Sequence, residues 1–316
     1  MRSEFKKRRL KKLKLKRKQQ RKRKIVLQTC FMIGILGATF LIVSKFESKK
    51  EQKTTKAIVK DEKENEVESL ELDNSGYLTL EKDKNAEDAV VVSENTNALV
   101  TGKKSYPVRS DGKKVAYLTF DDGPSKNTSK ILKILDRYSI KGTFFVLGNS
   151  IEKDKNANIL KDIVKQGHAI GNHTYSHNYG YLYPNGIINS ENFMKDIEKN
   201  NELMKSILGK DFSTRVIRFP GGYWTWEGRE VVKEKMLNKG YVNIFWNALN
   251  GDAEDVKKDE EELFLRTKET VEGLGEECDS IVLLMHDNYG KESTVNVLPR
   301  VIEYLQSKGF EFKSIK

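Results

Sequence analysis

From Val115 to the end, the chain alternates short apolar segments with longer amphipathic ones. The amphipathic segments, such as 129–140 and 296–309, carry apolar residues at helical spacing. The short segments that follow are rich in aromatic and β-branched residues, as strands are. Glycines stand where helices should end, at a position that favours positive φ: Gly142, Gly167, Gly240 and Gly309. This alternation predicts an α/β fold in which helices wrap parallel strands, either as a barrel or as an open sheet.

A different pattern, one unbroken apolar run, lies near the amino terminus. Residues 25–44 contain no charged side chain over 20 positions. As a helix this run would be about 30 Å long, which matches the hydrocarbon core of a bilayer. A cleavable signal peptide is the alternative, but its apolar region is shorter and ends in a small-residue site. Here the run leaves through Ser44-Lys45-Phe46. We therefore expect an uncleaved transmembrane helix.

Charge is concentrated before that run. Residues 1–24 hold 15 Lys and Arg against Glu4, a local net charge of +14, whereas the whole chain carries +11. The remainder therefore has a net charge of −3, which disfavours a nucleic-acid partner. A basic flank keeps its side of a membrane span in the cytoplasm. We expect a single-pass cell-membrane protein with a cytoplasmic tail, which could also bind anionic lipid head groups, and an extracellular catalytic domain.

Between the apolar run and the alternating region, residues 45–106 are rich in Lys, Glu, Asp, Asn and Ser. We interpret them as a polar stalk with little packed structure, followed by a catalytic domain at 107–316. Cys30 lies in the apolar run, so Cys278 is the only cysteine outside it and has no partner for an internal disulfide. No motif surrounds Cys278, which favours an inert residue over a nucleophile.

Polar side chains gather where the predicted strands end, which is where α/β folds place functional residues. They are Asp121-Asp122 after 116–120, His173 after 168–172, Arg218 before Pro220-Gly221-Gly222, Asp252 after 242–250, and His286-Asp287 after 280–285. No phosphate-binding glycine loop is present.

The segment "HTYSH" pairs His173 with His177 at a spacing that puts both imidazoles on one side of a helical turn. A surface turn would explain such a pair alone, but nearby carboxylates favour a metal site. Two histidines and one carboxylate leave coordination positions open, as in catalytic zinc sites. Nitrogen and oxygen ligands favour Zn²⁺, and Co²⁺, Ni²⁺ or Mn²⁺ could occupy the same set. The remaining histidine, His168, is expected to be structural.

In chain order, "TFDDGPS", "HTYSH", "RFPGG" and "LLMHD" resemble the signature of the NodB-homology polysaccharide deacetylases, carbohydrate esterase family 4. The resemblance covers about residues 110–316. It implies a deformed (β/α) barrel of seven or eight strands and metal-dependent, hydrolytic N-deacetylation of N-acetylglucosamine units in a polymer. It further implies a division of roles: Asp122, His173 and His177 hold the metal, Asp121 is the base, Arg218 orients Asp121, and His286 protonates the leaving amine.

Two motifs depart from the family. The third usually reads Arg-x-Pro-Tyr-Gly, and Gly221 stands at the Tyr position. We expect the Gly221 N–H to stabilise the oxyanion. Tyr223, Trp224 or Trp226 would supply a sugar-stacking surface, unless these rings only pack.

The fourth motif commonly reads Asp-x-x-Asp-Trp, but Leu249 replaces its first acid and Ala253 its Trp. Asp252, the second acid, is expected to raise the pKa of His286. The alternative is that Asp252 only caps the turn after Asn250-Gly251.

The predicted substrate is a cell-envelope polysaccharide, with peptidoglycan first, because an anchor favours a resident polymer. Alternatives are another acetylated polysaccharide, such as a chitin-like polymer or an exopolysaccharide, an O-acetyl ester, or an inactive wall-binding member of the fold. The last is disfavoured because both histidines, both aspartates, Arg218 and His286 are present together.

Overall fold

The computed structural model describes residues 76–103, 105–152, 154–254 and 256–316. The predicted basic tail, the predicted anchor at 25–44 and the stalk up to residue 75 lie outside the described residues. Within the described ranges, no helix combines the length and the apolar character needed to cross a membrane.

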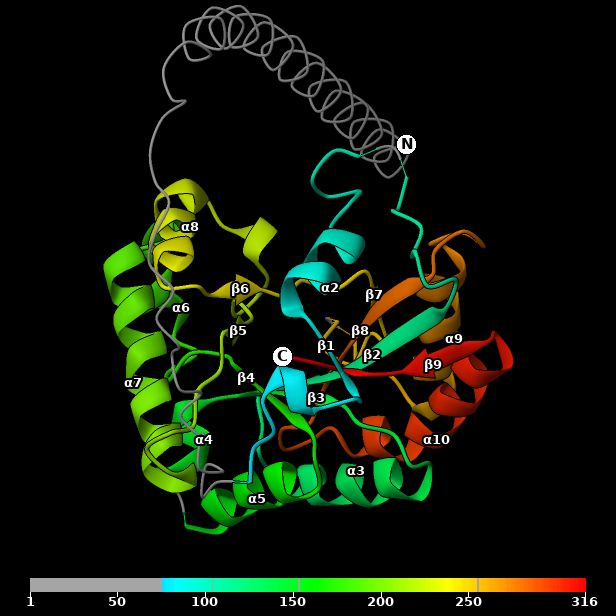
Figure 1. Ribbon diagram of the computed structural model, residues 1–316, viewed down its shortest axis with the longest axis horizontal. Coiled ribbons are helices and arrows are strands. Elements are labelled where there is room, and N and C mark those ends of the chain that lie inside the picture. Colours follow the sequence, from blue (N-terminus) through cyan, green and yellow to red (C-terminus); the bar gives the residue numbers. More distant parts are fainter. Residues whose placement is uncertain (1–75, 104, 153, 255) are drawn as a thin grey trace, which may run out of the picture. The chain divides into compact units, whose positions relative to one another are not determined.

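A curled sheet of eight parallel strands forms the centre of the fold (Figure 1). Its two longest strands, β2 (Lys114–Asp121) and β8 (Ser280–His286), pair along their length. The strand order is β6-β5-β4-β3-β2-β8-β7, with β9 paired to the start of β2. The other bounds are β3 (Thr143–Val146), β4 (Ala169–Asn172), β5 (Val216–Ile217), β6 (Val242–Asn243), β7 (Ala248–Leu249) and β9 (Phe310–Phe312). The α/β prediction is confirmed. The barrel is an open half-barrel, because no strand pairing joins β6 to β7 in the described part of the chain.

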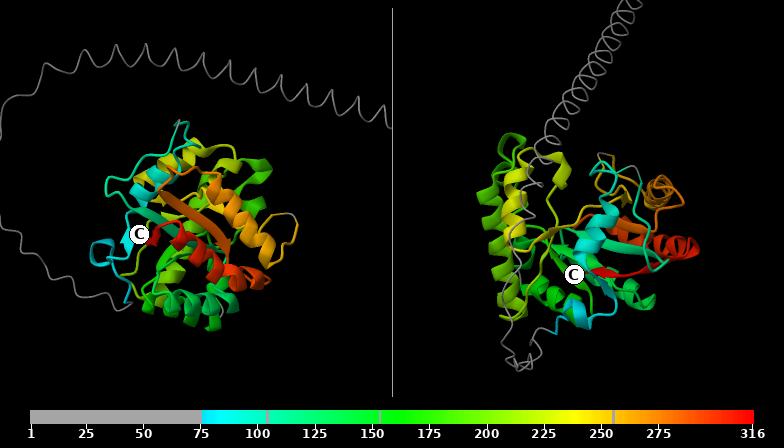
Figure 2. Two further views of the ribbon diagram at one scale, coloured as in Figure 1. Left: turned by 90° about the vertical axis from the view of Figure 1, so that its right-hand side faces the viewer. Right: turned by 45° about the horizontal axis from the view of Figure 1, so that its top comes forward.

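Helices cover the outer side of the sheet, as Figures 1 and 2 show from three directions. The helices that follow α2 (Ala89–Thr96) in the chain are α3 (Lys126–Arg137), α4 (Gly148–Ile151), α5 (Asp154–Lys165), α6 (Tyr179–Leu182), α7 (Ser190–Leu208), α8 (Arg229–Asn238), α9 (Glu260–Glu272) and α10 (Glu292–Ser307), and the 3-10 turns are η1 (Leu80–Lys82), η2 (Pro184–Gly186) and η3 (Tyr223–Thr225). Apolar residues of α3, α4, α5, α7, α9 and α10 enclose the largest core cluster together with alternate residues of β2, Ala116, Leu118 and Phe120. The buried residues of α6 and α8 belong to a separate cluster. Each fully buried Val, Leu, Ile, Phe or Met side chain contributes about 1.5–3 kcal/mol to the free energy of unfolding.

The other face of β2 points into the half-barrel. Val115 and Tyr117 belong to a second buried cluster there, and the two-residue period continues through Thr119 to Asp121. Asp121 therefore points inward because of its position in the strand.

Part of the predicted stalk belongs to the folded domain. Strand β1 (Ala86–Glu87) pairs with β10 (Ser314–Ile315) at the carboxyl terminus, and α2 (Ala89–Thr96) contacts β6 and β8. Ala89 and Val92 are fully buried against the inward-facing residues of the half-barrel. The prediction of little packed structure is therefore wrong for residues 86–98. The sequence concealed it, because the segment is short and its apolar residues lie on both the buried and the exposed side of the helix, which leaves no amphipathic pattern.

Two local predictions also need correction. Gly167, Gly240 and Gly309 have positive φ as expected, but after α3 it is Ser139, with φ 55°, that takes the left-handed position instead of Gly142. Residues 242–250 form two short strands, β6 and β7, at opposite edges of the sheet, where the apolar run predicted one strand. An apolar run indicates burial: Ile244 is fully buried and residues 245–247 are partly buried, but none of them is part of a strand.

Candidate active site

Asp121 ends β2 in a buried position, where it is 2% exposed. The Arg218 guanidinium donates from Nη1 to Asp121 Oδ1 at 2.8 Å. The same nitrogen lies 2.8 Å from Thr119 Oγ1, and Arg218 Nε donates to the Ile244 carbonyl at 3.0 Å. Arg218 also lies over the Phe145 ring. These contacts fix the guanidinium, so that it fixes the Asp121 carboxylate in turn.

Asp122 leaves the strand with φ 73°, a left-handed conformation that non-glycine residues rarely adopt. The turn directs its side chain to the same site as Asp121, although alternation would have sent it to the opposite face. Asn288 Nδ2 donates to Asp122 Oδ2 at 3.2 Å, while the buried Oδ1 has no hydrogen-bond partner among the described residues. A buried carboxylate oxygen without a partner is costly, which indicates that it serves a ligand.

The two histidines of "HTYSH" meet in a loop, and the predicted helical turn is wrong. Thr174 and His177 both have positive φ, 69° and 51°. The loop is held from α7: Asp196 Oδ2 accepts from the Tyr175 and Ser176 amides, and Asn200 Nδ2 donates to the Thr174 carbonyl. The i, i+4 spacing identified the correct pair of histidines. However, the two rings are brought together by the contacts of their loop with α7, and not by a helical conformation of the segment itself.

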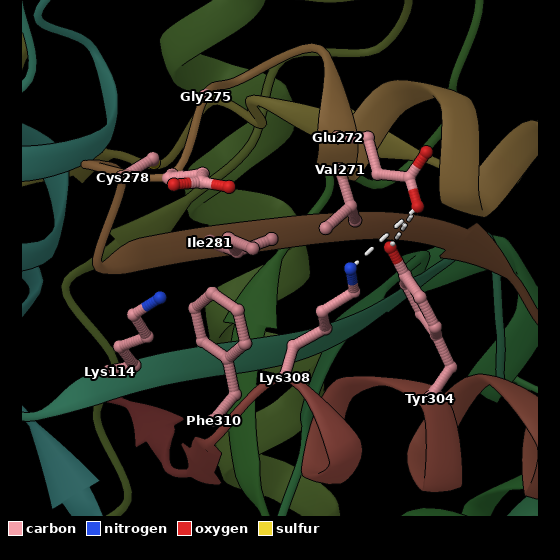
Figure 3. A pocket seen from close by; sticks show the side chains of 10 residues that line it. Lys114, Val271, Glu272, Gly275, Cys278, Ile281, Tyr304, Lys308 and Phe310 are labelled. Carbon is pink, nitrogen blue, oxygen red and sulfur yellow. Dashed lines mark hydrogen bonds and ion pairs between the residues drawn. The ribbon is translucent and has the colours of Figure 1, made fainter.

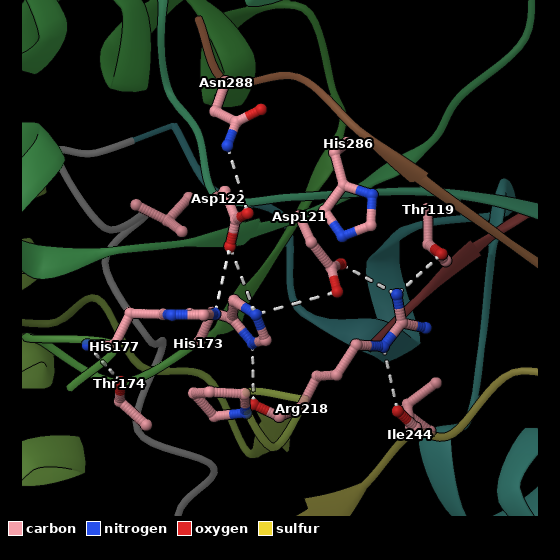
Figure 4. Close-up of polar contacts among 12 residues, drawn as sticks. Thr119, Asp121, Asp122, His173, Thr174, His177, Arg218, Ile244, His286 and Asn288 are labelled. Carbon is pink, nitrogen blue, oxygen red and sulfur yellow. Dashed lines mark hydrogen bonds and ion pairs between the residues drawn. The ribbon is translucent and has the colours of Figure 1, made fainter. Parts of the chain in front are cut away.

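Asp122, His173 and His177 offer three ligand atoms that lie within 4.8 Å of one another (Figure 4). His173 Nδ1 donates to the Arg218 carbonyl at 2.8 Å, which leaves Nε2 unprotonated and facing Asp122. Asp122 Oδ1 lies 3.5 Å from His173 Nε2 and 3.4 Å from His177 Nε2. Ligands about 2.0–2.1 Å from a tetrahedral ion are about 3.3 Å apart, so the three residues fit a metal ion.

His286 ends β8, and its Nδ1 lies 2.7 Å from Asp252 Oδ1. The second carboxylate oxygen of Asp252 accepts from the His286 amide at 2.9 Å and from Thr294 Oγ1 at 2.7 Å. Within the turn, the side chain that accepts a backbone N–H is that of Asn250, whose Oδ1 accepts from the Asp252 amide. The carboxylate is thus aimed at the histidine, and a pure turn cap does not describe it.

The pKa values of the titratable side chains in the site are shifted in different directions. Burial raises the pKa of Asp121 above its usual range, against the opposing effect of Arg218. Burial lowers the pKa of His173 to about 3, so this imidazole is neutral and able to bind a metal. Burial also disfavours the imidazolium of His286, but the hydrogen bond to Asp252 and the nearby acids outweigh it and raise the pKa to about 9. At neutral pH His286 therefore carries a proton that it can donate.

The comparisons with known proteins agree with this geometry. The family model described as polysaccharide deacetylase matches residues 108–239. A putative polysaccharide deacetylase of Bacillus subtilis, YheN, is 31% identical over 64% of this chain and 67% of its own length. The chain belongs to the polysaccharide deacetylase family. It is thus a hydrolase of amide bonds in a polysaccharide.

Two further relatives bear on the fold and the substrate. A peptidoglycan-N-acetylglucosamine deacetylase of Bacillus cereus is 29% identical to this deacetylase, over 76% of this chain and 86% of the relative. The solved structure of a CE4 esterase of Streptococcus mutans is 31% identical, with a TM-score of 0.65 over 73% of this chain and 92% of that one.

The aromatic residues that follow the third motif of this deacetylase have different surroundings. Trp226 stacks on Tyr183 at 4.2 Å and donates from Nε1 to the Pro220 carbonyl. Tyr223 and Trp224 line a groove of about 290 Å³ together with residues of α2 and α8. Their ring contacts are with each other and with Phe219 and Arg229. Trp226 is therefore a packing residue, and a sugar-binding role for Tyr223 and Trp224 stays a prediction.

Sequence reasoning missed the residues that support the site from outside its motifs. Asn288, Asp196 and Thr119 all hold a site residue or its loop. Asn288 follows the "LLMHD" motif directly, a signal that could have been used. Asp196 lies within a long amphipathic helix, where a polar residue is ordinarily read as solvent-exposed.

Cys278 and His168 lie apart from this chemistry. The Cys278 thiol is buried, which raises its pKa to about 11, so it is a poor nucleophile at neutral pH. It lines a cavity of about 530 Å³ with Lys114, the first residue of β2, whose other end carries Asp121 (Figure 3). His168 accepts the Gly142 N–H at Nδ1 and packs edge-on to Phe144. Both are structural residues in this arrangement.

Proposed function

We propose that this chain removes acetyl groups from N-acetylglucosamine units of peptidoglycan in a metal-dependent reaction. The observation that supports the proposal most strongly is the ligand set of Asp122, His173 and His177, with His286 and the Asp121–Arg218 pair also at the carboxyl ends of strands. The spacing of the three ligand atoms and the partnerless Asp122 oxygen both fit a small divalent cation, with Zn²⁺ favoured by the nitrogen and oxygen ligands and Co²⁺, Ni²⁺ or Mn²⁺ as alternatives. Such an ion supplies Lewis acidity, which acidifies water and polarises an amide carbonyl.

The protein's own groups then divide the proton transfers. Asp121 accepts a proton from the attacking water at its carboxylate, which Arg218 holds in place. The acid's raised pKa makes it a better base than an exposed aspartate. As water adds to the carbonyl carbon, negative charge develops on the carbonyl oxygen. The Gly221 N–H, which has no hydrogen-bond partner among the described residues, is available to stabilise that charge.

His286 completes the reaction at the opposite side of the amide. Its Nδ1 is engaged by Asp252, so Nε2 is the atom that delivers a proton to the leaving nitrogen. Cleavage of the carbon–nitrogen bond then gives acetate and a free amine on the sugar. Asp252 acts through His286 and is a positioning residue.

The choice of peptidoglycan is supported by the printed name of the Bacillus cereus relative and by the predicted location. An anchor at residues 25–44 would hold the domain on the outer side of the cell membrane, next to the wall. Another acetylated polysaccharide or an O-acetyl ester would use the same chemistry. An inactive wall-binding role is disfavoured, because the proposed base, acid and metal ligands all have the contacts that their roles require.

Mass spectrometry of wall digests from cells with and without the gene tests the proposed substrate. We expect wild-type muropeptides to include species lighter by about 42 Da, the mass lost when hydrolysis replaces an acetyl group by hydrogen. Fragmentation assigns the loss to a sugar. Loss on N-acetylglucosamine supports the proposal, loss on N-acetylmuramic acid reassigns the sugar, and digests that do not differ contradict a wall substrate.

A further inference from the structure

Gly221 is enclosed by two aromatic side chains. A Cβ atom placed on it would lie 2.9 Å from Trp226 Cζ2 and 3.0 Å from the Tyr179 hydroxyl oxygen. Gly221 also has φ 70°, which a larger residue adopts only with strain. The space beside the proposed oxyanion donor is therefore taken by a phenol hydroxyl that comes from a different segment of the chain.

Tyr179 is the first residue of α6, two positions after His177. Its ring centroid lies 5.2 Å from that of His177 and 5.2 Å from that of Trp226. Trp226 is itself fixed by its stack on Tyr183 and by its hydrogen bond to Pro220. The Tyr179 ring is thus held between a metal ligand and the Gly221 loop.

Tyr179 is 44% exposed, and its hydroxyl has no hydrogen-bond partner among the described residues. A phenol O–H donates one hydrogen bond, and here it lies next to the Gly221 backbone on the side of the metal ligand His177. A substrate carbonyl oxygen that approaches the Gly221 N–H would come close to the same hydroxyl.

We propose that Tyr179 is a catalytic residue whose hydroxyl donates a second hydrogen bond to the carbonyl oxygen of the substrate's acetyl group. The bond strengthens as negative charge develops on that oxygen, so it lowers the barrier rather than only tightening binding. This inference rests on the proposed deacetylase function and deepens it.

The competing explanation is packing: Tyr179 would only brace the His177 ring and shield the Gly221 loop. The two differ in what the oxygen atom does. The variant Tyr179→Phe keeps the ring and its contacts with His177 and Trp226 but removes the donor. Tyr181→Phe is the matched control, because Tyr181 lies on the same helix, is 39% exposed and has no ring contact with either residue among those described.

Three measurements on the full chain separate the explanations. Metal content is measured by elemental analysis, kcat and KM by acetate release from an N-acetylglucosamine oligomer, and acetate affinity by calorimetric titration. For Tyr179→Phe we expect unchanged metal content, kcat lower by about 10²-fold and KM changed much less, as for loss of one oxyanion donor. Acetate, whose carboxylate would accept the same bond, should bind about tenfold more weakly. Tyr181→Phe should match the wild type throughout.

The inference is overturned if Tyr179→Phe retains wild-type kcat and acetate affinity, if only KM changes, or if the variant loses metal, which would assign Tyr179 to bracing His177. A wild-type protein that releases no acetate from any acetylated glycan would instead contradict the proposed function. In that case the acetate titration still decides whether the hydroxyl contacts a carbonyl-type oxygen.

Discussion

His286 Nδ1 and Asp252 Oδ1 lie 2.7 Å apart, although 34 residues separate them in the chain. The carboxylate replaces the aqueous partner that the buried imidazolium has lost, and the pKa of His286 is consequently raised to about 9. The fourth motif of the family commonly has two acids. Here Leu249 takes the position of the first acid, and Asp252, the second, reaches the histidine.

Asp252→Asn should lower the pKa of His286, because a neutral amide stabilises the imidazolium less than a carboxylate does. The proton on His286 is present below its pKa and lost above it, so the alkaline limb of the kcat/KM profile should move to lower pH. Metal content should stay at the wild-type level. pH–rate profiles with parallel elemental analysis measure both, and an unchanged alkaline limb would remove Asp252 from the account.

Asn288→Ala should weaken metal binding. Asn288 holds Asp122 Oδ2 and leaves Oδ1 to face both histidines, and removing such a supporting contact typically lowers metal affinity about 10–100-fold. Competition with a chelator gives the affinity directly. Tyr289→Ala is the control, since the neighbouring side chain is 63% exposed. Equal affinities in the wild type and Asn288→Ala would show that Asp122 needs no such support.

Val92→Ala should destabilise the catalytic domain by about 2 kcal/mol, from two lost methyl groups and the cavity left behind. Val92 is fully buried in α2 against the interior of the half-barrel, whereas its neighbour Val91 is 42% exposed. Val91→Ala should stay within about 0.5 kcal/mol of wild type. Denaturant unfolding compares the two. If both variants unfold like the wild type, α2 is not part of the cooperative unit.

The predicted anchor at residues 25–44 has a test in cells. External protease applied to intact cells should remove the catalytic domain and leave the basic tail protected on the cytoplasmic side. Antibodies or tags at each end of the chain follow the two parts. Release into the medium of a protein that begins shortly after Ser44 would establish a signal peptide in place of the anchor.

Much of this site could be predicted from the sequence because strand ends are visible in it. The apolar segments 116–120 and 280–285 end at Asp121 and His286, and parallel strands bring such ends together. The fold class follows from the same alternation. Packing of α2 could not be predicted, because three valines in a polar segment carry a weak signal.

Contacts between segments far apart in the chain were also beyond the sequence. Tyr179 beside Gly221, and Asp196 under the histidine loop, depend on tertiary packing that no local pattern records. The left-handed conformations of Asp122 and His177 belong to the same class, since neither residue type requires positive φ. Such conformations persist only where the surrounding structure holds them.

The central claim is that Asp121 and Asp122, adjacent in the chain, do different work: Asp122 binds the metal and Asp121 accepts the proton. Metal content and kcat of Asp121→Asn and Asp122→Ala, measured side by side, test it most directly. We predict that Asp122→Ala loses its metal, whereas Asp121→Asn keeps a full complement and loses about 10²–10⁴-fold in kcat, as expected for a missing general base. Equal loss of metal in both variants, or full turnover in Asp121→Asn, would contradict the account.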